Sequence, residues 1–173
     1  MIRAIDRLMH RIALATALLG GGVLIALVVL TVISVTGRSL VFAGLAPVPG
    51  DFELVEAGTA FAVFAFLPWC HLTRGHATVE IFTLRLPGQA TWVLQVVADL
   101  LMLAVAALFL WRHWIGMLDT RRYGETTFIL QFPLWWAYAA ASLGAGVFLI
   151  VSVWCLIRDF ADPDSARNGL NQT

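Results

Sequence analysis

A run of 26 residues without a charged side chain, 12–37, constrains this chain more than any other feature of its sequence. At a rise of about 1.5 Å per residue, a helix of this length crosses the roughly 30 Å hydrocarbon layer of a bilayer. Elsewhere the chain is similar: 60% of all residues are hydrophobic, 13% are charged, and the mean hydropathy is +0.85. A soluble domain is typically about 45–50% apolar and about 25% charged. We therefore expect an integral membrane protein without a separate catalytic domain.

Charge gaps and helix breakers divide the chain into four expected membrane helices. Pro68 is expected to kink the last turn of the second helix, and a Leu-Pro-Gly breaker precedes the third. The fourth uses the 32 uncharged residues between Glu125 and Arg158, with Pro133 in its first turn. The predicted fold is an all-α membrane domain, 1–173, with helices at about 12–37, 52–72, 89–113 and 133–157.

Three flanking segments complete this reading of the chain. The basic N-terminus, 1–11, precedes an apolar run longer than a signal-peptide core and is expected to be retained. Residues 78–86 mix apolar side chains with Glu80 and Arg85, so they are candidates for a short amphipathic segment at the membrane interface. The tail, 159–173, is polar and is expected to fray.

The distribution of arginine predicts the orientation. Four crossings place both termini on one side, and cytoplasmic segments are enriched in basic residues. With the termini inside, the inner segments hold seven arginines and the outer segments four, which favours an N-in, C-in topology. The inner arginines are Arg3, Arg7, Arg11, Arg74, Arg85, Arg158 and Arg167; the outer ones are Arg38, Arg112, Arg121 and Arg122. Eleven acidic residues balance these eleven bases, so nothing in the net charge points to nucleic acid.

Asp99 is the sharpest candidate for a functional group. A charged residue near the middle of a membrane span costs roughly 2.5–3.5 kcal/mol on insertion scales. One interpretation is a proton or cation site; the other, which we favour, is a carboxyl group bonded to a neighbouring helix or to a partner subunit. Gln95 lies one turn earlier on the same face. No arginine is expected at this depth, so any ionic partner of Asp99 is expected to come from outside the chain.

A second candidate lies at the opposite side of the membrane. Arg38 ends the first expected helix, and Asp51, Glu53 and Glu56 begin the second. A partly desolvated guanidinium facing carboxylates forms strong, bidentate pairs, whereas a solvated pair contributes only about 0–1 kcal/mol. We expect a structural clamp between the two helices.

Other reactive side chains give no site of their own. The four histidines are spread over the chain, with His71 and His113 expected roughly a membrane apart, so no pair can ligate one haem and no metal site or cofactor is expected. A surface metal bound by His71, His76 and Glu80 is disfavoured against a plain interfacial turn. Cys70 and Cys155 are both expected near the reducing inner side, without a disulfide. Small residues, at 13–22 in the first helix and 137–145 in the last, mark expected sites of close helix approach.

The order of several short motifs resembles the small membrane subunit, the DctQ-type permease, of tripartite ATP-independent periplasmic transporters. The resemblance runs from about residue 12 to 157 and rests on motifs that follow in a fixed order. They are Arg38, then Asp51, Glu53 and Leu54, then Arg74, Gly75, His76 and Val79, then Leu86 and Pro87, then Trp114, and finally Phe132, Pro133, Trp136 and Tyr138. The chain departs from the family at Ser39 after the arginine, at Phe52 between the acids, and at Pro68, Trp69 and Cys70. Asp99 is not part of the pattern.

The resemblance implies a scaffold in a binding-protein-dependent, ion-gradient-driven transporter for organic acids in the bacterial inner membrane. Its implied partners are a large transmembrane subunit, a periplasmic substrate-binding protein and membrane lipid. The candidate structural or interface residues are Arg38, Asp51, Glu53, Glu56, Asp99, Trp136 and Tyr138. Two other classes remain open at this point: a stand-alone four-helix exporter or channel using Asp99, and the membrane anchor of a redox enzyme. None of the three is an enzyme in its own right.

Overall fold

Four long helices make up most of the computed structural model, which describes residues 2–74 and 88–161. They are α1 (Ile2–Ser39), α2 (Asp51–Leu72), α4 (Gly88–Tyr123) and α5 (Trp135–Ala161), with a short 3₁₀ helix, η1 (Val41–Ala43), after α1. All four are long and apolar enough to cross a membrane. The prediction of an all-α fold with four membrane helices is therefore confirmed. The candidate amphipathic segment at 78–86 lies outside the described residues.

The helices are longer than the apolar spans that mark them. Helix α1 begins at Ile2 rather than at residue 12, and α4 ends at Tyr123 rather than at 113. Charged residues such as Arg11 and Arg112 end an apolar span, but arginine is a good helix former and does not end the helix. Helix α5 likewise continues to Ala161. The start of the polar tail at 159 was therefore wrong, because Asp159 lies inside α5.

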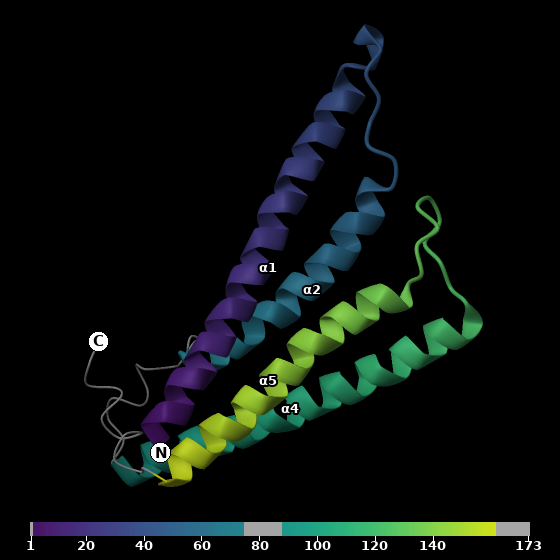
Figure 1. Cartoon of the computed structure of the whole chain (residues 1–173). Helices are drawn as coiled ribbons and strands as arrows, with labels where there is room; N and C mark the ends of the chain where they lie inside the picture. The colour runs from purple at the N-terminus through teal and green to yellow at the C-terminus, as the bar shows by residue number, and fades with distance from the viewer. Residues whose placement is uncertain (1, 75–87, 162–173) are drawn as a thin grey trace.

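The helices form a fan rather than a closed bundle (Figure 1). Helix α2 lies between α1 and α5, and α5 lies between α2 and α4, so α1 and α4 are the two edges. The helices converge where α1 begins and α5 ends, which we call the terminal end, and splay toward the loops 40–50 and 124–134, which we call the loop end (Figure 1).

Small side chains set the close approaches within the fan. A Cβ atom added to Gly20 of α1 would lie 2.9 Å from the Cβ of Ala65 on α2. A Cβ atom added to Gly144 of α5 would lie 2.8 Å from the backbone of Phe64, also on α2. Both small-residue patches therefore pack against α2. The larger buried side chains gather at the terminal end, in a core of Met9, Ala13, Leu72, Val151, Trp154 and Cys155.

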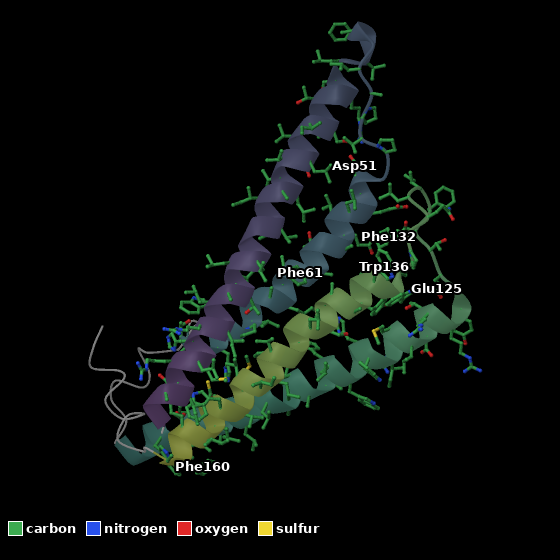
Figure 2. All side chains as sticks on the ribbon, in the orientation of Figure 1. Asp51, Phe61, Glu125, Phe132, Trp136 and Phe160 are labelled. Atoms are coloured by element: carbon green, nitrogen blue, oxygen red, sulfur yellow. The ribbon has the colours of Figure 1, made fainter. Side chains whose placement is uncertain are left out.

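The two edge helices leave most of their apolar surface uncovered by the chain. In the most apolar 18 residues of α1 and of α4, 11% are buried within the chain, against 17% in α2 and 44% in α5. Figure 2 shows side chains projecting outward along these edges. A surface of this extent needs lipid or another protein against it.

Candidate functional site

Polar side chains gather at both ends of the fan. The terminal cluster consists of Asp6, His71, Arg74, Trp92, Gln95, Asp99, Trp154, Arg158 and Asp159. The loop cluster consists of Ser34, Arg38, Asp51, Glu53, Ile129 and Leu130. In Figure 2 the labelled Asp51 and Phe160 mark these two ends.

An ion pair between Arg74 and Asp159 is the centre of the terminal cluster. Arg74 Nη2 donates to both oxygens of Asp159, at 2.7 and 2.9 Å. The Asp159 side chain is 0% exposed. Arg74 follows the end of α2 with a left-handed φ of 54°, and its N–H donates to the His71 carbonyl, so the end of α2 fixes the position of this arginine. An ion pair this deeply buried costs about 3–5 kcal/mol when one partner is removed.

Further polar contacts bring all four helices to this point. Trp92 Nε1 of α4 donates to the Asp159 carbonyl oxygen at 3.1 Å. Arg158 Nη1 of α5 lies 3.6 Å from Asp6 Oδ1 of α1, and Trp154 Nε1 donates to the same oxygen at 3.2 Å. In a membrane, where apolar side chains gain little by leaving lipid, such polar links and close packing hold helices together. The terminal cluster is thus the junction of the fan.

Asp99 belongs to this cluster, which corrects two expectations. Its carboxylate Oδ1 lies 3.8 Å from His71 Nε2 of α2 and accepts from Gln95 Nε2 at 3.4 Å, so partners do come from within the chain. Asp99 is also not in the middle of its helix. Because α4 runs on to Tyr123, Asp99 falls in its first third, at the level where α2 and α5 end.

The sequence interpretation missed Asp159 and its partner. Asp159 was assigned to the tail, and Arg74 was noted only among the inner arginines and in a family motif. A signal was present: a carboxylate in the last turn of a helix opposes the helix dipole, so it needs a cation nearby. The cation is Arg74, which is distant in sequence, and the helical spacing of α5 alone does not identify it.

The clamp at the loop end forms through Asp51, and its buried partner is a serine. The fully buried Ser34 of α1 donates its hydroxyl hydrogen to Asp51 Oδ2, and the Phe52 N–H donates to Oδ1 at 2.8 Å. Arg38 Nη2 lies 3.8 Å from Asp51 Oδ2, but the Arg38 side chain is 67% exposed. Exposed pairs contribute about 0–1 kcal/mol. The hydrogen bond from Ser34 therefore connects α1 to α2 more firmly than the arginine does.

Glu53 and Glu56 do not form the expected ion pairs with Arg38. Glu53 accepts two backbone N–H groups, from Ile129 at 2.6 Å and from Leu130 at 2.9 Å. These bonds attach the α4–α5 loop to the start of α2. Glu56 is exposed and borders a cavity. Leu130 also covers Gly50, the N-cap residue of α2. Glycine suits this position because its φ is 73° and the Leu130 side chain leaves no room for a Cβ atom.

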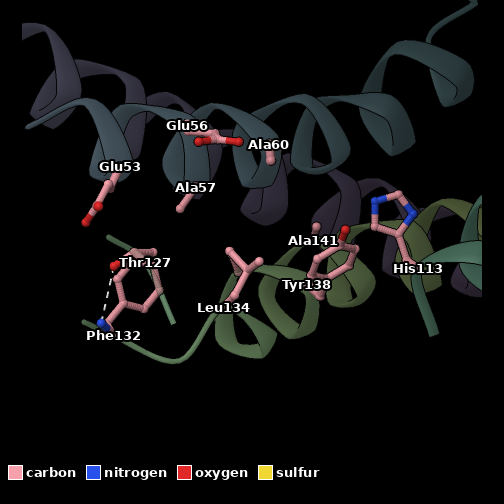
Figure 3. Close-up of a pocket in the computed structure, with 11 residues that line it drawn as sticks. Glu53, Glu56, Ala57, Ala60, His113, Thr127, Phe132, Leu134, Tyr138 and Ala141 are labelled. Carbon is pink, nitrogen blue, oxygen red and sulfur yellow. Dashed lines mark hydrogen bonds between the residues drawn. The ribbon is translucent and has the colours of Figure 1, made fainter. Parts of the chain in front are cut away.

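The cavity beside Glu56 has a volume of about 250 Å³ and lies between α2, α4 and α5 (Figure 3). Glu53, His113 and Tyr138 supply its other prominent polar groups. Trp136, in contrast, borders an apolar groove of about 730 Å³ between α1 and α5, floored by α2. Trp136 and Tyr138 thus border different hollows, and Phe132 borders both. Within 2–74 and 88–161, no three His, Cys, Asp or Glu residues are arranged to hold a metal ion, and both cysteines are free.

Comparison with known proteins identifies the family. No curated protein and no solved structure matches this chain. The family model described as the DctQ component of tripartite ATP-independent periplasmic transporters matches residues 27–162. The match covers α2, α4, α5 and the loop-end part of α1, and it confirms the resemblance drawn from the ordered motifs. The chain therefore belongs to the DctQ family and is the small membrane component of a tripartite ATP-independent periplasmic transporter.

Proposed function

We propose that this chain is a scaffold that holds the large, substrate-moving membrane subunit of its transporter and that it does not carry the substrate itself. The observation that carries the proposal is the apolar surface left open on α1 and α4, where only 11% of the most apolar 18 residues are buried within the chain. In a membrane such a face meets either lipid or a partner helix, and a scaffold needs a face that its own chain leaves open for its partner.

Helix continuity supports the same assignment. Transport sites near the bilayer midplane are typically formed by discontinuous helices, whose free ends bind substrate or ions. Helices α1 and α4 each run unbroken, over 38 and 36 residues, and α5 is unbroken over 27 residues. These helices are suited to forming a fixed surface. We assign no catalytic role to the chain.

The remaining parts of the proposal follow from the family. The partners are a large transmembrane subunit and a periplasmic binding protein, and the cargo is an organic acid driven by an ion gradient. The chain lies in the bacterial inner membrane with both termini in the cytoplasm, as the arginine distribution predicts. Arg38, Asp51, Glu53 and Glu56 then face the periplasm, where Asp51 and Glu53 fix the splay of α1 and the α4–α5 loop beside the large subunit.

Photocrosslinking from the two edges tests this scaffold function. A photoreactive phenylalanine analogue replaces Ile25 on α1 or Leu101 on α4, both of which are exposed. After irradiation of native membranes, we expect at least one position to crosslink to a large multi-helix membrane protein. Phe148, which is buried on α5 and similar in size to the analogue, is the matched control and should crosslink only within the chain.

Uptake measurements separate a scaffold from a transport site. In vesicles reconstituted with the whole complex, variants at the crosslinking edge should lower assembly and organic-acid uptake together, with unchanged apparent substrate affinity. Crosslinks to lipid alone from both edges, while the large subunit still co-purifies, would contradict the assignment of the open faces. A changed substrate affinity in fully assembled complexes would contradict the scaffold role itself.

A further inference from the structure

One oxygen of the terminal cluster, Asp99 Oδ2, is buried and receives no hydrogen bond from a donor in the described part of the chain. The Asp99 side chain is 5% exposed and lines a cavity of about 270 Å³ between α2 and α4. His71, Arg74 and Gln95 line the same cavity, and apolar side chains form the rest of its wall. A buried carboxylate without a full set of partners is unfavourable, so something else must stabilise it.

Among the described residues, the charges of the terminal cluster do not balance. From α2 and its end come His71 and Arg74. From α5 come Arg158 and Asp159, with the thiol of Cys155 nearby. Helix α1 supplies Asp6, which contacts Arg158, and Gln95 is the neutral neighbour of Asp99 on α4. Arg74 is taken by Asp159 at 2.7 Å, and Arg158 lies 3.6 Å from Asp6. In the described part of the cluster, two arginines therefore stand with three aspartates, so with a neutral His71 these side chains sum to one negative charge.

The position of Asp159 indicates what neutralises that charge. Asp159 accepts both hydrogen bonds from Arg74, the guanidinium that also lines the Asp99 cavity, so this arginine is already engaged by another carboxylate. The buried Oδ2 of Asp99 has no donor among the described residues, so a proton on the Asp99 carboxyl group removes a charge that is otherwise costly to bury.

We propose that the terminal cluster is a proton-binding site, in which one exchangeable proton is held on Asp99 beside His71. A hard metal cation fits the cavity less well, because such ions prefer six or more oxygen ligands. Here a guanidinium and an imidazole line the wall instead. A proton needs only one carboxylate oxygen.

Binding of this proton is coupled to the packing of α4. The folded chain holds a proton that Asp99 releases when it is exposed to water, so the folded state binds more protons than the unfolded state. Stability contributed by the site is then present at low pH and is lost as the pH rises. Asp99→Asn replaces the protonated carboxyl group with a neutral group of similar shape, so it should remove this dependence without unfolding the chain.

Infrared spectroscopy of the purified full chain in lipid nanodiscs tests the proposal. A protonated carboxyl group absorbs at a carbonyl frequency separate from that of a carboxylate. In the unaltered chain this band should disappear as the pH is raised, and the thermal midpoint should fall over the same interval. Asp99→Asn should lack the band and have a midpoint that is flat across that interval. Glu56→Gln, an exposed carboxylate at the other end, is the matched control and should behave like the unaltered chain.

Three results would overturn the proposal. The same band in Asp99→Asn would place the proton elsewhere. Absence of the band in the unaltered chain, together with a pH-dependent thermal midpoint that becomes flat in His71→Gln, would place the proton on the imidazole rather than on Asp99. A rise in thermal midpoint on adding sodium chloride at fixed pH and ionic strength, seen in the unaltered chain and absent in Asp99→Asn, would identify a metal-cation site instead.

Discussion

Replacing Arg74 with alanine tests whether the terminal cluster is the junction of the fan. The substitution leaves Asp159, which is 0% exposed, without the donor of its two hydrogen bonds at 2.7 and 2.9 Å. Removing one partner of a buried ion pair typically costs 3–5 kcal/mol. The Arg74 side chain is itself 31% exposed, so water reaches part of the site. We therefore expect a loss near the lower limit, about 3 kcal/mol.

Two further variants separate charge from geometry. Arg74→Lys keeps the charge but lacks the planar group that contacts both oxygens, so we expect an intermediate loss of about 1–2 kcal/mol. Asp159→Asn leaves a partly exposed arginine that can hydrate, and it should cost less than Arg74→Ala. The double variant should be less destabilised than the sum of the two single changes, because each removes the same interaction.

Reversible unfolding of the full chain, in mixed micelles with increasing denaturing detergent, gives these free energies. Arg158→Ala is a comparison variant: its contacts are longer, at 3.6 Å to Asp6 and 3.9 Å to Asp159, so it should cost less than Arg74→Ala. A loss under about 1 kcal/mol for Arg74→Ala would show that Asp159 finds water or another donor. The terminal cluster would then not be the junction of the helices.

Four other changes follow from the geometry. Gly144→Ala should destabilise the chain by about 1–3 kcal/mol in the same assay, since its Cβ would meet the Phe64 backbone at 2.8 Å, whereas Gly146→Ala, with no atom within 4 Å, should be neutral or slightly stabilising. Ser34→Ala should lower the free energy of unfolding by about 1–2 kcal/mol and Arg38→Ala by under about 1 kcal/mol. A larger loss for Arg38→Ala than for Ser34→Ala would show that the arginine is the main link between α1 and α2. Glu53→Gln should speed amide hydrogen exchange at Ile129 and Leu130, with Glu56→Gln as the unaffected control; equal protection in both would show that the loop does not depend on Glu53. In a background without Cys70 and Cys155, an impermeant reagent should label Gly44→Cys and Gly124→Cys but not Ala4→Cys in intact cells, and the opposite pattern would invert the proposed topology.

The sequence predicted the membrane spans well because the cost of placing charge in lipid is large and local. Each long stretch without charged residues therefore had to be a membrane span, independently of how the helices pack. The ends of the helices could not be read in the same way, since a helix continues past the membrane surface when arginine and other helix formers follow. This difference placed Asp99 too deep: its depth depends on where α4 begins and ends, and the apolar run reported only part of that helix.

Pairing between distant residues was the part that the sequence could not supply. The acidic start of α2 was correctly singled out, but which acid meets which partner depends on the rotation of each helix. That rotation directs Asp51 toward Ser34 and Glu53 toward the backbone of Ile129 and Leu130. No charge rule indicates a serine or a peptide N–H as the partner of a carboxylate. Asp159 was missed for the same reason, because its partner Arg74 is 85 residues away.

The fan also explains why the polar contacts lie where they do. Helix association in a membrane rests on close packing and polar links, and the close approach of α1 to α2 lies near the middle of α1, where Gly20 meets Ala65. Beyond that point it carries bulky residues such as Ile25 and Val32, which face outward. Without a link at the loop end, α1 would be free to swing away from α2. The hydrogen bond from Ser34 to Asp51 supplies that link and fixes the width of the apolar groove beside Trp136. A change at Ser34 should therefore alter the shape of the groove, although neither residue of this bond lines it.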